Sequence, residues 1–204
     1  MAFLSNFIEN VYLKKLIPDL RVAIPKTAVI GVDEFDNFLE TNNLYDVIFE
    51  DKEYDHVLEA FRTARLSEKL RDNLRKYLQV MTKPLAVRSS GLFEDSLNQP
   101  FAGVYSTYLL PNNHPDFEHR LEDVENAIKL VFASIYSPES RAYFNAIDYM
   151  IEEEKMAVII QEVIGNEHNG RYYPEISGVA QSYNFYPFSY IQPEDGFAVT
   201  AIGL

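Results

Sequence analysis

A single arginine in a run of hydroxyl-bearing and glycine residues is the part of the sequence best suited to chemistry. The apolar run 85–87 precedes Arg88, and the run 89–91 (Ser-Ser-Gly) follows it. A guanidinium presents a fixed fork of donors that suits phosphate or carboxylate oxygens, and a nearby glycine lets backbone N–H groups approach the same anion. This predicts a polyphosphate site. Pairing of Arg88 with Glu94 or Asp95, which would only pin a loop, fits the spacing equally well.

The sequence predicts one strand that contains this arginine and two further strands after it. The apolar run after Pro84 predicts a buried strand that ends at Arg88, because the residues at 89–91 are turn formers. The β-rich composition of 104–110 predicts a second strand. The apolar run 156–160 predicts a third strand, which continues through 161–163.

The sequence before the arginine strand predicts several helices. The opening residues, with Phe3, Phe7 and Val11 four apart, predict an amphipathic helix. An extended entry and strand over 22–30 leads to a helix that Asp33 caps. Residues 46–55 are interpreted as a surface linker. Leucines four apart predict a helix or a helix pair over 57–78.

The second half of the chain begins with a long helix. Apolar residues over 117–135 predict a helix of about five turns, and Ser137 followed by proline predicts the cap of a shorter one. Asn169-Gly170 is typical of a hairpin turn. The segment 165–187 is polar and aromatic without a clear period, and the chain ends in the apolar run 197–204.

Composition narrows the classes of function. The 204 residues are 47% hydrophobic, enough for a folded core, and lack cysteine, which excludes disulfides and thiolate metal sites. A formal net charge of -13 argues against binding to nucleic acid or an anionic membrane. No apolar run approaches the roughly 18 residues of a membrane helix. We therefore expect a soluble, cytoplasmic protein.

Several short motifs occur together in one order. They are Val87-Arg88-Ser89-Ser90, then Glu94-Asp95-Ser96, then Phe101-Ala102-Gly103 with Thr107. In this order they resemble the nucleotide-binding domain of phosphoenolpyruvate synthase and pyruvate phosphate dikinase. The resemblance implies an α+β fold of the ATP-grasp kind, incomplete at both ends. It implies a first subdomain over 1–163 and the start of a second over 164–204.

The resemblance also implies a role for individual residues. Arg88 would contact the nucleotide phosphates and act in catalysis, and Gly103 and Thr107 would form the loop over the phosphates. Gln161, with the backbone of Glu162 and Val163, would lie at the hinge that holds the adenine. Three of these residues also have a purely structural interpretation. Gly103 can be a bulge glycine, Thr107 an ordinary strand residue and Gln161 a buried amide.

Some parts of the family pattern are not found in this sequence. A leading Gly-Gly-Lys segment, an acidic metal ligand and a distal Gln-x-Arg strand are missing, and the segment 165–187 departs from the pattern. We therefore expect a fragment that turns over no ATP alone, with the Mg²⁺ ligands outside it and no metal site within it. The four histidines have no setting typical of a phosphoryl carrier: His56, His114, His119 and His168.

The resemblance implies a phosphotransferase of the pyruvate, water dikinase kind. Such an enzyme transfers a phosphoryl group from ATP to a histidine on another domain and from there to pyruvate. Related dikinases with a glucan or an antibiotic as acceptor are an alternative. A non-catalytic nucleotide-sensing module is a further alternative, because the segment 165–187 is atypical.

Overall fold

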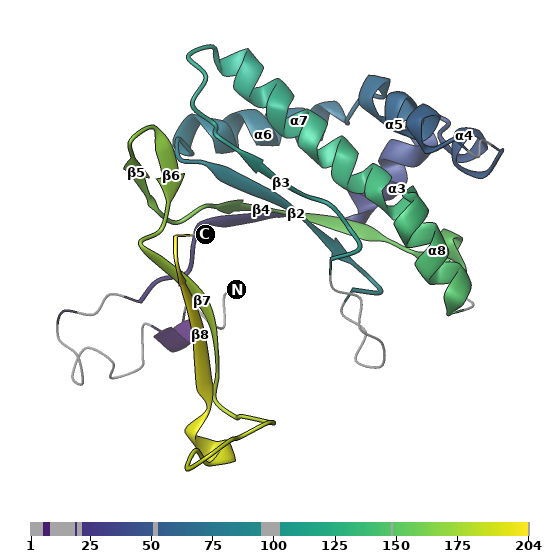
Figure 1. Ribbon diagram of the computed structural model, residues 1–204. Coiled ribbons are helices and arrows are strands. Elements are labelled where there is room, and N and C mark those ends of the chain that lie inside the picture. Colours follow the sequence, from purple (N-terminus) through teal and green to yellow (C-terminus); the bar gives the residue numbers. More distant parts are fainter. Residues whose placement is uncertain are drawn as a thin grey trace. The chain divides into compact units, whose positions relative to one another are not determined.

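Four antiparallel strands form the central sheet of the computed structural model, which describes residues 6–8, 19, 22–50, 53–94, 103–147 and 149–203 (Figure 1). The strand order is β1-β4-β2-β3. The strands comprise β1 (Thr27–Ile30), β2 (Leu85–Gly91), β3 (Thr107–Leu110) and β4 (Met156–Glu162). The chain divides into two compact units, Met1–Val163 and Ile164–Leu204, and this sheet belongs to the first. The opening helix predicted from Phe3 onward lies mostly outside the described residues.

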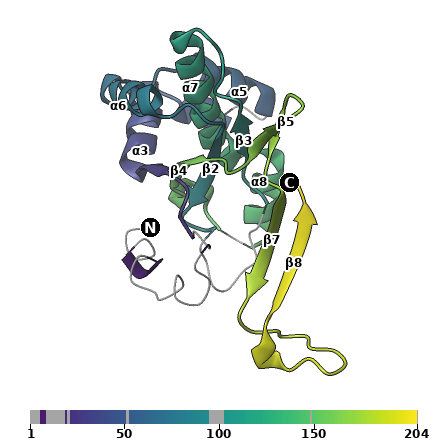
Figure 2. The same ribbon diagram turned by 90° about the vertical axis from the view of Figure 1, so that its left-hand side faces the viewer.

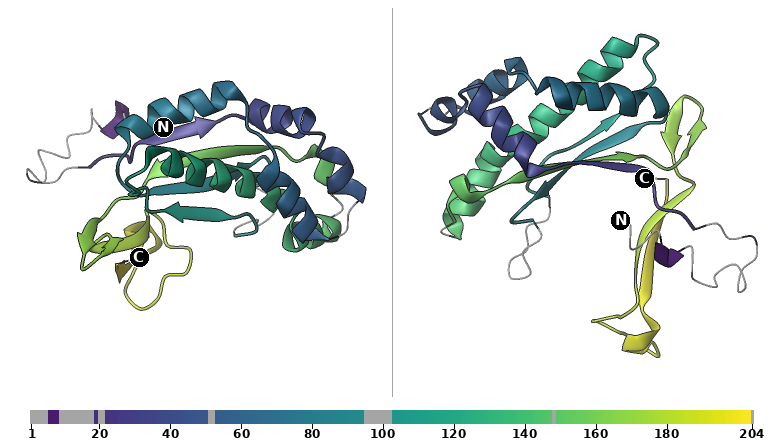
Figure 3. Two further views of the ribbon diagram at one scale, coloured as in Figure 1. Left: turned by 90° about the horizontal axis from the view of Figure 1, so that it is seen from above. Right: turned by 180° about the vertical axis from the view of Figure 1, so that it is seen from behind.

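Helices of the first unit pack on one face of this sheet (Figures 1 and 3). They are α3 (Val32–Thr41), α4 (Tyr45–Glu50), α5 (Tyr54–Thr63), α6 (Glu68–Val80), α7 (Phe117–Ala133) and α8 (Pro138–Ala146). A short 3₁₀ turn follows α7 at Ser134–Tyr136, and another follows α8 at Ile151–Glu153. The helix pair α5 and α6 replaces the single helix that also fitted the leucine spacing, because Ser67 caps α6 by accepting a hydrogen bond from the Leu70 amide.

The core lies between the helices and the sheet. Aromatic rings from three helices meet there, with Phe35 and Phe132 at 5.1 Å between centroids and Phe38 and Phe61 at 5.5 Å. All four rings are fully buried. Such rings bury large apolar areas and prefer tilted contacts, so they supply much of the force that holds the helices on the sheet.

The predicted end of the arginine strand was wrong. The Ser-Ser-Gly run after Arg88 continues β2 instead of ending it, because Ser89 and Gly91 pair with Val158 and Met156 of β4. Pairing with a seven-residue neighbour outweighs the weak turn preference of these residues. Arg88 is therefore in the middle of a strand, not at its end.

The predicted linker 46–55 is also partly helical. Helix α4 spans Tyr45–Glu50 and buries Ile48, and α5 already begins at Tyr54. One buried side chain in six residues is too short a pattern to show a helical period in the sequence. Helix α3 begins at Val32 rather than after Asp33, which lies in its first turn.

The second unit consists of two hairpins (Figure 2). Strands β5 (Asn166–His168) and β6 (Arg171–Tyr173) are joined by the predicted turn, in which Asn169 and Gly170 both have positive φ. Strands β7 (Ile176–Gln181) and β8 (Phe197–Ile202) form the second hairpin, with a 3₁₀ turn at Pro193–Asp195 between them. Among the described residues, no helix is long and apolar enough to cross a membrane.

Candidate functional site

The two faces of the central sheet differ in chemistry. Alternate residues of a strand point to opposite faces, so the register assigns each side chain to a face. Leu85 and Val87 of β2, with Val158 and Ile160 of β4, are buried under the helices. The intervening residues point to the other face, which no helix of the described part of the first unit covers (Figures 1 and 3). We call this second face the open face.

Three of the predicted site residues share the open face. Arg88 of β2 lies directly opposite Thr107 of β3, and opposite Ile159 of β4. Gln161 follows two residues after Ile159 on the same strand, so it points to the same face. Side chains at directly opposed positions lie about 5 Å apart at Cβ, close enough to act on one ligand group.

Apolar side chains lie beside these polar ones on the open face. Val29 of β1 is 63% exposed and pairs with Ile159, and Leu109 of β3 is 61% exposed. A surface with apolar contact area and a few convergent polar groups is typical of small-molecule sites. A nucleotide requires this combination, because its base is a flat ring system and its phosphates are charged.

Among the described residues, no acidic side chain forms an ion pair with Arg88. Arg88 is exposed. Glu94, one of its two candidate partners, instead accepts a hydrogen bond from the Gly91 amide at 3.2 Å. Asp95 lies outside the described residues. Pairing of Arg88 with Glu94 is therefore not observed, and the role of Arg88 at the phosphates stays a prediction.

Glu162 and Val163 lie where β4 ends. The Glu162 side chain points to the helix-covered face, where it is buried and pairs with Lys83 at 2.9 Å. Its amide donates to the Lys26 carbonyl, and the Val163 amide donates to the Pro84 carbonyl, each at 2.9 Å. A base at this hinge would therefore be held by carbonyl oxygens or side chains, not by these two amides. Their role at the hinge stays a prediction.

Gly103 precedes β3 and has a backbone conformation that favours glycine. Its φ is 80°, and a Cβ placed there would meet nothing within 4 Å. The requirement for glycine is therefore conformational and not steric, which agrees with a tight turn before Thr107. The motif residues Asp95, Ser96, Phe101 and Ala102 lie outside the described residues.

A buried carboxylate that sequence reasoning missed supports the end of β2. Glu154 is 2% exposed and accepts a hydrogen bond from the Phe93 amide at 3.2 Å. Burial raises the pKa of Glu154. Burial, and after it the charge of Glu154, also raises the pKa values of Tyr105 and Tyr149. In the sequence Glu154 belongs to the polar run 152–155. Only its position close to the start of a buried strand distinguishes it from its neighbours.

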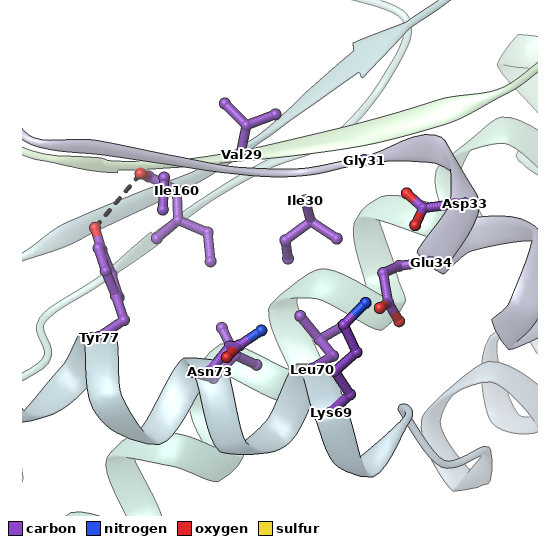
Figure 4. Close-up of a pocket in the computed structure, with 12 residues that line it drawn as sticks. Val29, Ile30, Gly31, Asp33, Glu34, Lys69, Leu70, Asn73, Tyr77 and Ile160 are labelled. Carbon is purple, nitrogen blue, oxygen red and sulfur yellow. Dashed lines mark hydrogen bonds between the residues drawn. The ribbon is translucent and has the colours of Figure 1, made fainter.

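A cavity of about 250 Å³ lies on the other side of β1, between this strand and α6 (Figure 4). Ile30, Leu70 and Ile160 line it, and the Tyr77 hydroxyl donates to the Ile160 carbonyl at 3.4 Å. Burial raises the pKa of Tyr77 to about 12, so this phenol stays neutral. The cavity opens on the helix-covered side, away from Arg88. It is therefore not part of the open face.

The acidic residues and histidines of the described segments do not assemble a metal centre. No group of three or more metal-ligating side chains occurs in the part of the chain that the structure describes. The rings of His114 and of His119 in α7 make a tilted contact at 4.0 Å between centroids, and His168 stacks on Tyr173. No step of the chemistry is therefore assigned to a metal held by these residues.

Comparison with known proteins assigns the chain to a family. Residues 9–203 match the family described as pyruvate phosphate dikinase, AMP/ATP-binding domain. The chain belongs to this family. A curated relative from Bacillus subtilis (strain 168), described as uncharacterized phosphotransferase YvkC, is 26% identical over 150 residues. The matched region is 72% of this chain and only 16% of that relative.

Family membership supports nucleotide binding for this chain. The family is described by its AMP/ATP-binding domain. A nucleotide is a polyphosphate ligand, which is the ligand class expected for the site around Arg88. The assignment of individual residues to the nucleotide comes from the sequence motifs and stays a prediction. The register shows only that Arg88, Thr107 and Gln161 share one face of the sheet.

Proposed function

We propose that the open face of the β1-β4-β2-β3 sheet binds ATP, with Arg88 and Thr107 at the phosphates and Gln161 at the adenine. Gly103 would let the segment before β3 approach the phosphates. In this proposal the fold is of the ATP-grasp kind. The unit Met1–Val163 is its first nucleotide-binding subdomain, and Ile164–Leu204 begins the second.

The observation that carries the proposal is the shared face of Arg88, Thr107 and Gln161. These residues come from three strands that are far apart in the sequence, and the register brings all three side chains to one side of the sheet. A purely structural role for each would not require a common face. The exposed guanidinium adds the positive charge that a polyphosphate needs.

The proposed reaction is the transfer of a phosphoryl group from ATP, through a phosphohistidine on another domain, to pyruvate. Catalysis of phosphoryl transfer depends on positioning and on stabilisation of the charge that spreads over the phosphate oxygens. Arg88 would provide that stabilisation, because a guanidinium can donate two parallel hydrogen bonds to phosphate oxygens. Mg²⁺ bound with ATP would supply further neutralising charge, and we assign no described residue to holding it.

Isothermal titration of the full-length protein with ATP tests this proposal. Arg88→Ala should weaken binding by about 1.5 to 3 kcal/mol, the range for hydrogen bonds to charged groups, or roughly 10- to 150-fold. Lys76→Ala is the matched control, because it removes an exposed positive charge from α6 on the helix-covered side. Equal losses in the two variants would show a general charge effect and would contradict a site at Arg88.

A further inference from the structure

The side chain of Gln161 is held in one orientation by a short chain of hydrogen bonds on the open face. Gln161 and Thr27 are directly opposed on β4 and β1. The Gln161 amide nitrogen donates to Thr27 Oγ1 at 3.1 Å, and Thr27 Oγ1 donates to the Pro25 carbonyl at 2.9 Å. Both side chains are half-buried, which favours a fixed geometry over a mobile one.

The direction of this chain follows from the chemistry of its members. A carbonyl oxygen can only accept, so the single hydroxyl proton of Thr27 must go to Pro25. The Thr27 oxygen is then left with lone pairs, and the atom of Gln161 that faces it must be a donor. Because only the amide nitrogen can donate, the NH₂ group points to Thr27 and the amide cannot be turned by 180°.

The Gln161 oxygen is consequently left as a hydrogen-bond acceptor. None of the described residues donates to this atom. It belongs to a side chain on the same face as Arg88, two residues along β4 from the position opposite the arginine. A fixed acceptor at the place proposed for the base can distinguish purines by the group at carbon 6. Adenine carries a donor amine there, whereas guanine carries an acceptor oxygen.

We infer that Thr27 is a specificity-determining positioning residue, which fixes the Gln161 amide so that its oxygen accepts from the 6-amino group of adenine and opposes the oxygen of a 6-oxopurine. This inference rests on the proposed function, since it requires the base to lie at Gln161. It adds a residue that does not touch the nucleotide.

Loss of the Thr27 hydroxyl should change selectivity more than stability. Without it the amide is free to turn, and its NH₂ group can then donate to a 6-oxo group. A site that offers a matched acceptor discriminates by leaving a polar group unpaired when the wrong ligand binds, and a site that adapts loses this discrimination. Valine at position 27 keeps the shape of the side chain and suits an edge strand.

The test is the ratio of the dissociation constants of ITP and ATP, measured by titration with the full-length protein. ITP differs from ATP by the 6-oxo group, and its phosphates are the same. We expect Thr27→Val and Thr27→Ala to lower this ratio by about 5- to 10-fold, the value of one hydrogen bond of about 1 kcal/mol. Thr27→Ser should restore it, since serine keeps the hydroxyl. Arg88→Ala should weaken both nucleotides equally and leave the ratio unchanged.

The possible failures are distinguishable. A protein that binds ATP, but whose ratio is the same in Thr27→Val and Thr27→Ala as in the wild type, overturns the role of Thr27 alone. Gln161→Met then shows whether the amide contacts the base at all, since an unchanged ratio there removes Gln161 as well. A wild-type protein that binds neither nucleotide overturns the proposed function and this inference with it.

Discussion

The carboxylate of Glu154 lies against Gly91, the last residue of the strand that carries Arg88. A Cβ on Gly91 would come within 2.5 Å of Glu154 Oε1 and within 2.6 Å of the Tyr105 ring. Separations this short do not occur between packed atoms, so an alanine would displace the carboxylate or the ring. The glycine therefore allows a buried acid and a buried phenol to close on the end of β2.

Gly91→Ala should accordingly destabilise the protein. Over-packing in a buried site costs about 1 to 3 kcal/mol, and here the displaced group is also hydrogen-bonded to the Phe93 amide. Urea unfolding followed by circular dichroism measures the effect. Leu92→Ala, at an exposed neighbour, should change the unfolding free energy by less than about 0.5 kcal/mol. A Gly91→Ala protein as stable as the wild type would show that this packing is loose.

Glu154 should also leave a signature in the pH dependence of stability. Burial raises the pKa of Glu154 in the folded state. An acid with a raised folded pKa binds its proton more tightly when folded, so the stability it contributes falls as the pH rises from about 4.3, its unfolded value, through the folded pKa. Glu154→Gln cannot ionise. Its stability relative to the wild type should therefore be greater at pH 8 than at pH 4.

The control for this pH dependence is Glu153→Gln, which removes an exposed acid next in the chain. Its stability relative to the wild type should be nearly the same at both pH values. Unfolding free energies from urea titrations at four or five pH values between 4 and 8 give both curves. Parallel curves for Glu154→Gln and Glu153→Gln would show that Glu154 is not penalised by burial.

Asn112 ties the segment between α6 and β2 to α7 and should be hard to replace. Its side chain donates to the carbonyls of Met81 and Lys83 at 3.0 and 2.9 Å, and accepts from Arg120 Nε at 2.9 Å. Asn112 is buried and has a φ of 53°. Removing the side chain leaves buried groups unpaired, at about 1 to 3 kcal/mol each.

Two substitutions separate the hydrogen bonds of Asn112 from its backbone strain. Asn112→Gly removes the bonds but tolerates positive φ, whereas Asn112→Ala removes the bonds and adds about 1 kcal/mol of strain. We expect both to destabilise, with alanine the worse by roughly that amount. Unfolding free energies in urea measure the difference. Equal effects would mean that the backbone relaxes.

The sequence predicted the elements of this fold better than their edges. The periodic runs of α7 and β4 are long, so their types could be read directly, and Ser137 with proline marked the start of α8. The end of β2 could not be read, because the pairing of Ser89 and Gly91 is decided by a strand some 65 residues later in the chain. Local residue preferences carry no information about such a partner.

The candidate site was predictable only in part for the same reason. Motif order singled out Arg88, Thr107 and Gln161, but the common face on which they lie is a property of the strand register. Thr27 was missed because a threonine in a strand is ordinary until its partner is known to be Gln161. Glu162 has a side chain on the opposite face, which alternation from Gln161 already implies.

The opposition of Arg88 and Thr107 leads to a final prediction about ATP binding. Arg88 and Thr107 are directly opposed, so both side chains can bind the same phosphate oxygens. If they do, their contributions to the affinity for ATP should depend on each other. Thr107→Val, which keeps the shape and removes the hydroxyl, should weaken ATP binding by about 1 kcal/mol, or roughly fivefold. In an Arg88→Ala background the same change should have a smaller effect, because the phosphate is no longer held against the threonine.

A double-mutant cycle on titration-derived affinities measures this coupling, which we expect to be about 0.5 to 1 kcal/mol. Strict additivity would place the two residues at separate parts of the nucleotide, and no effect of Thr107→Val in either background would remove Thr107 from the site.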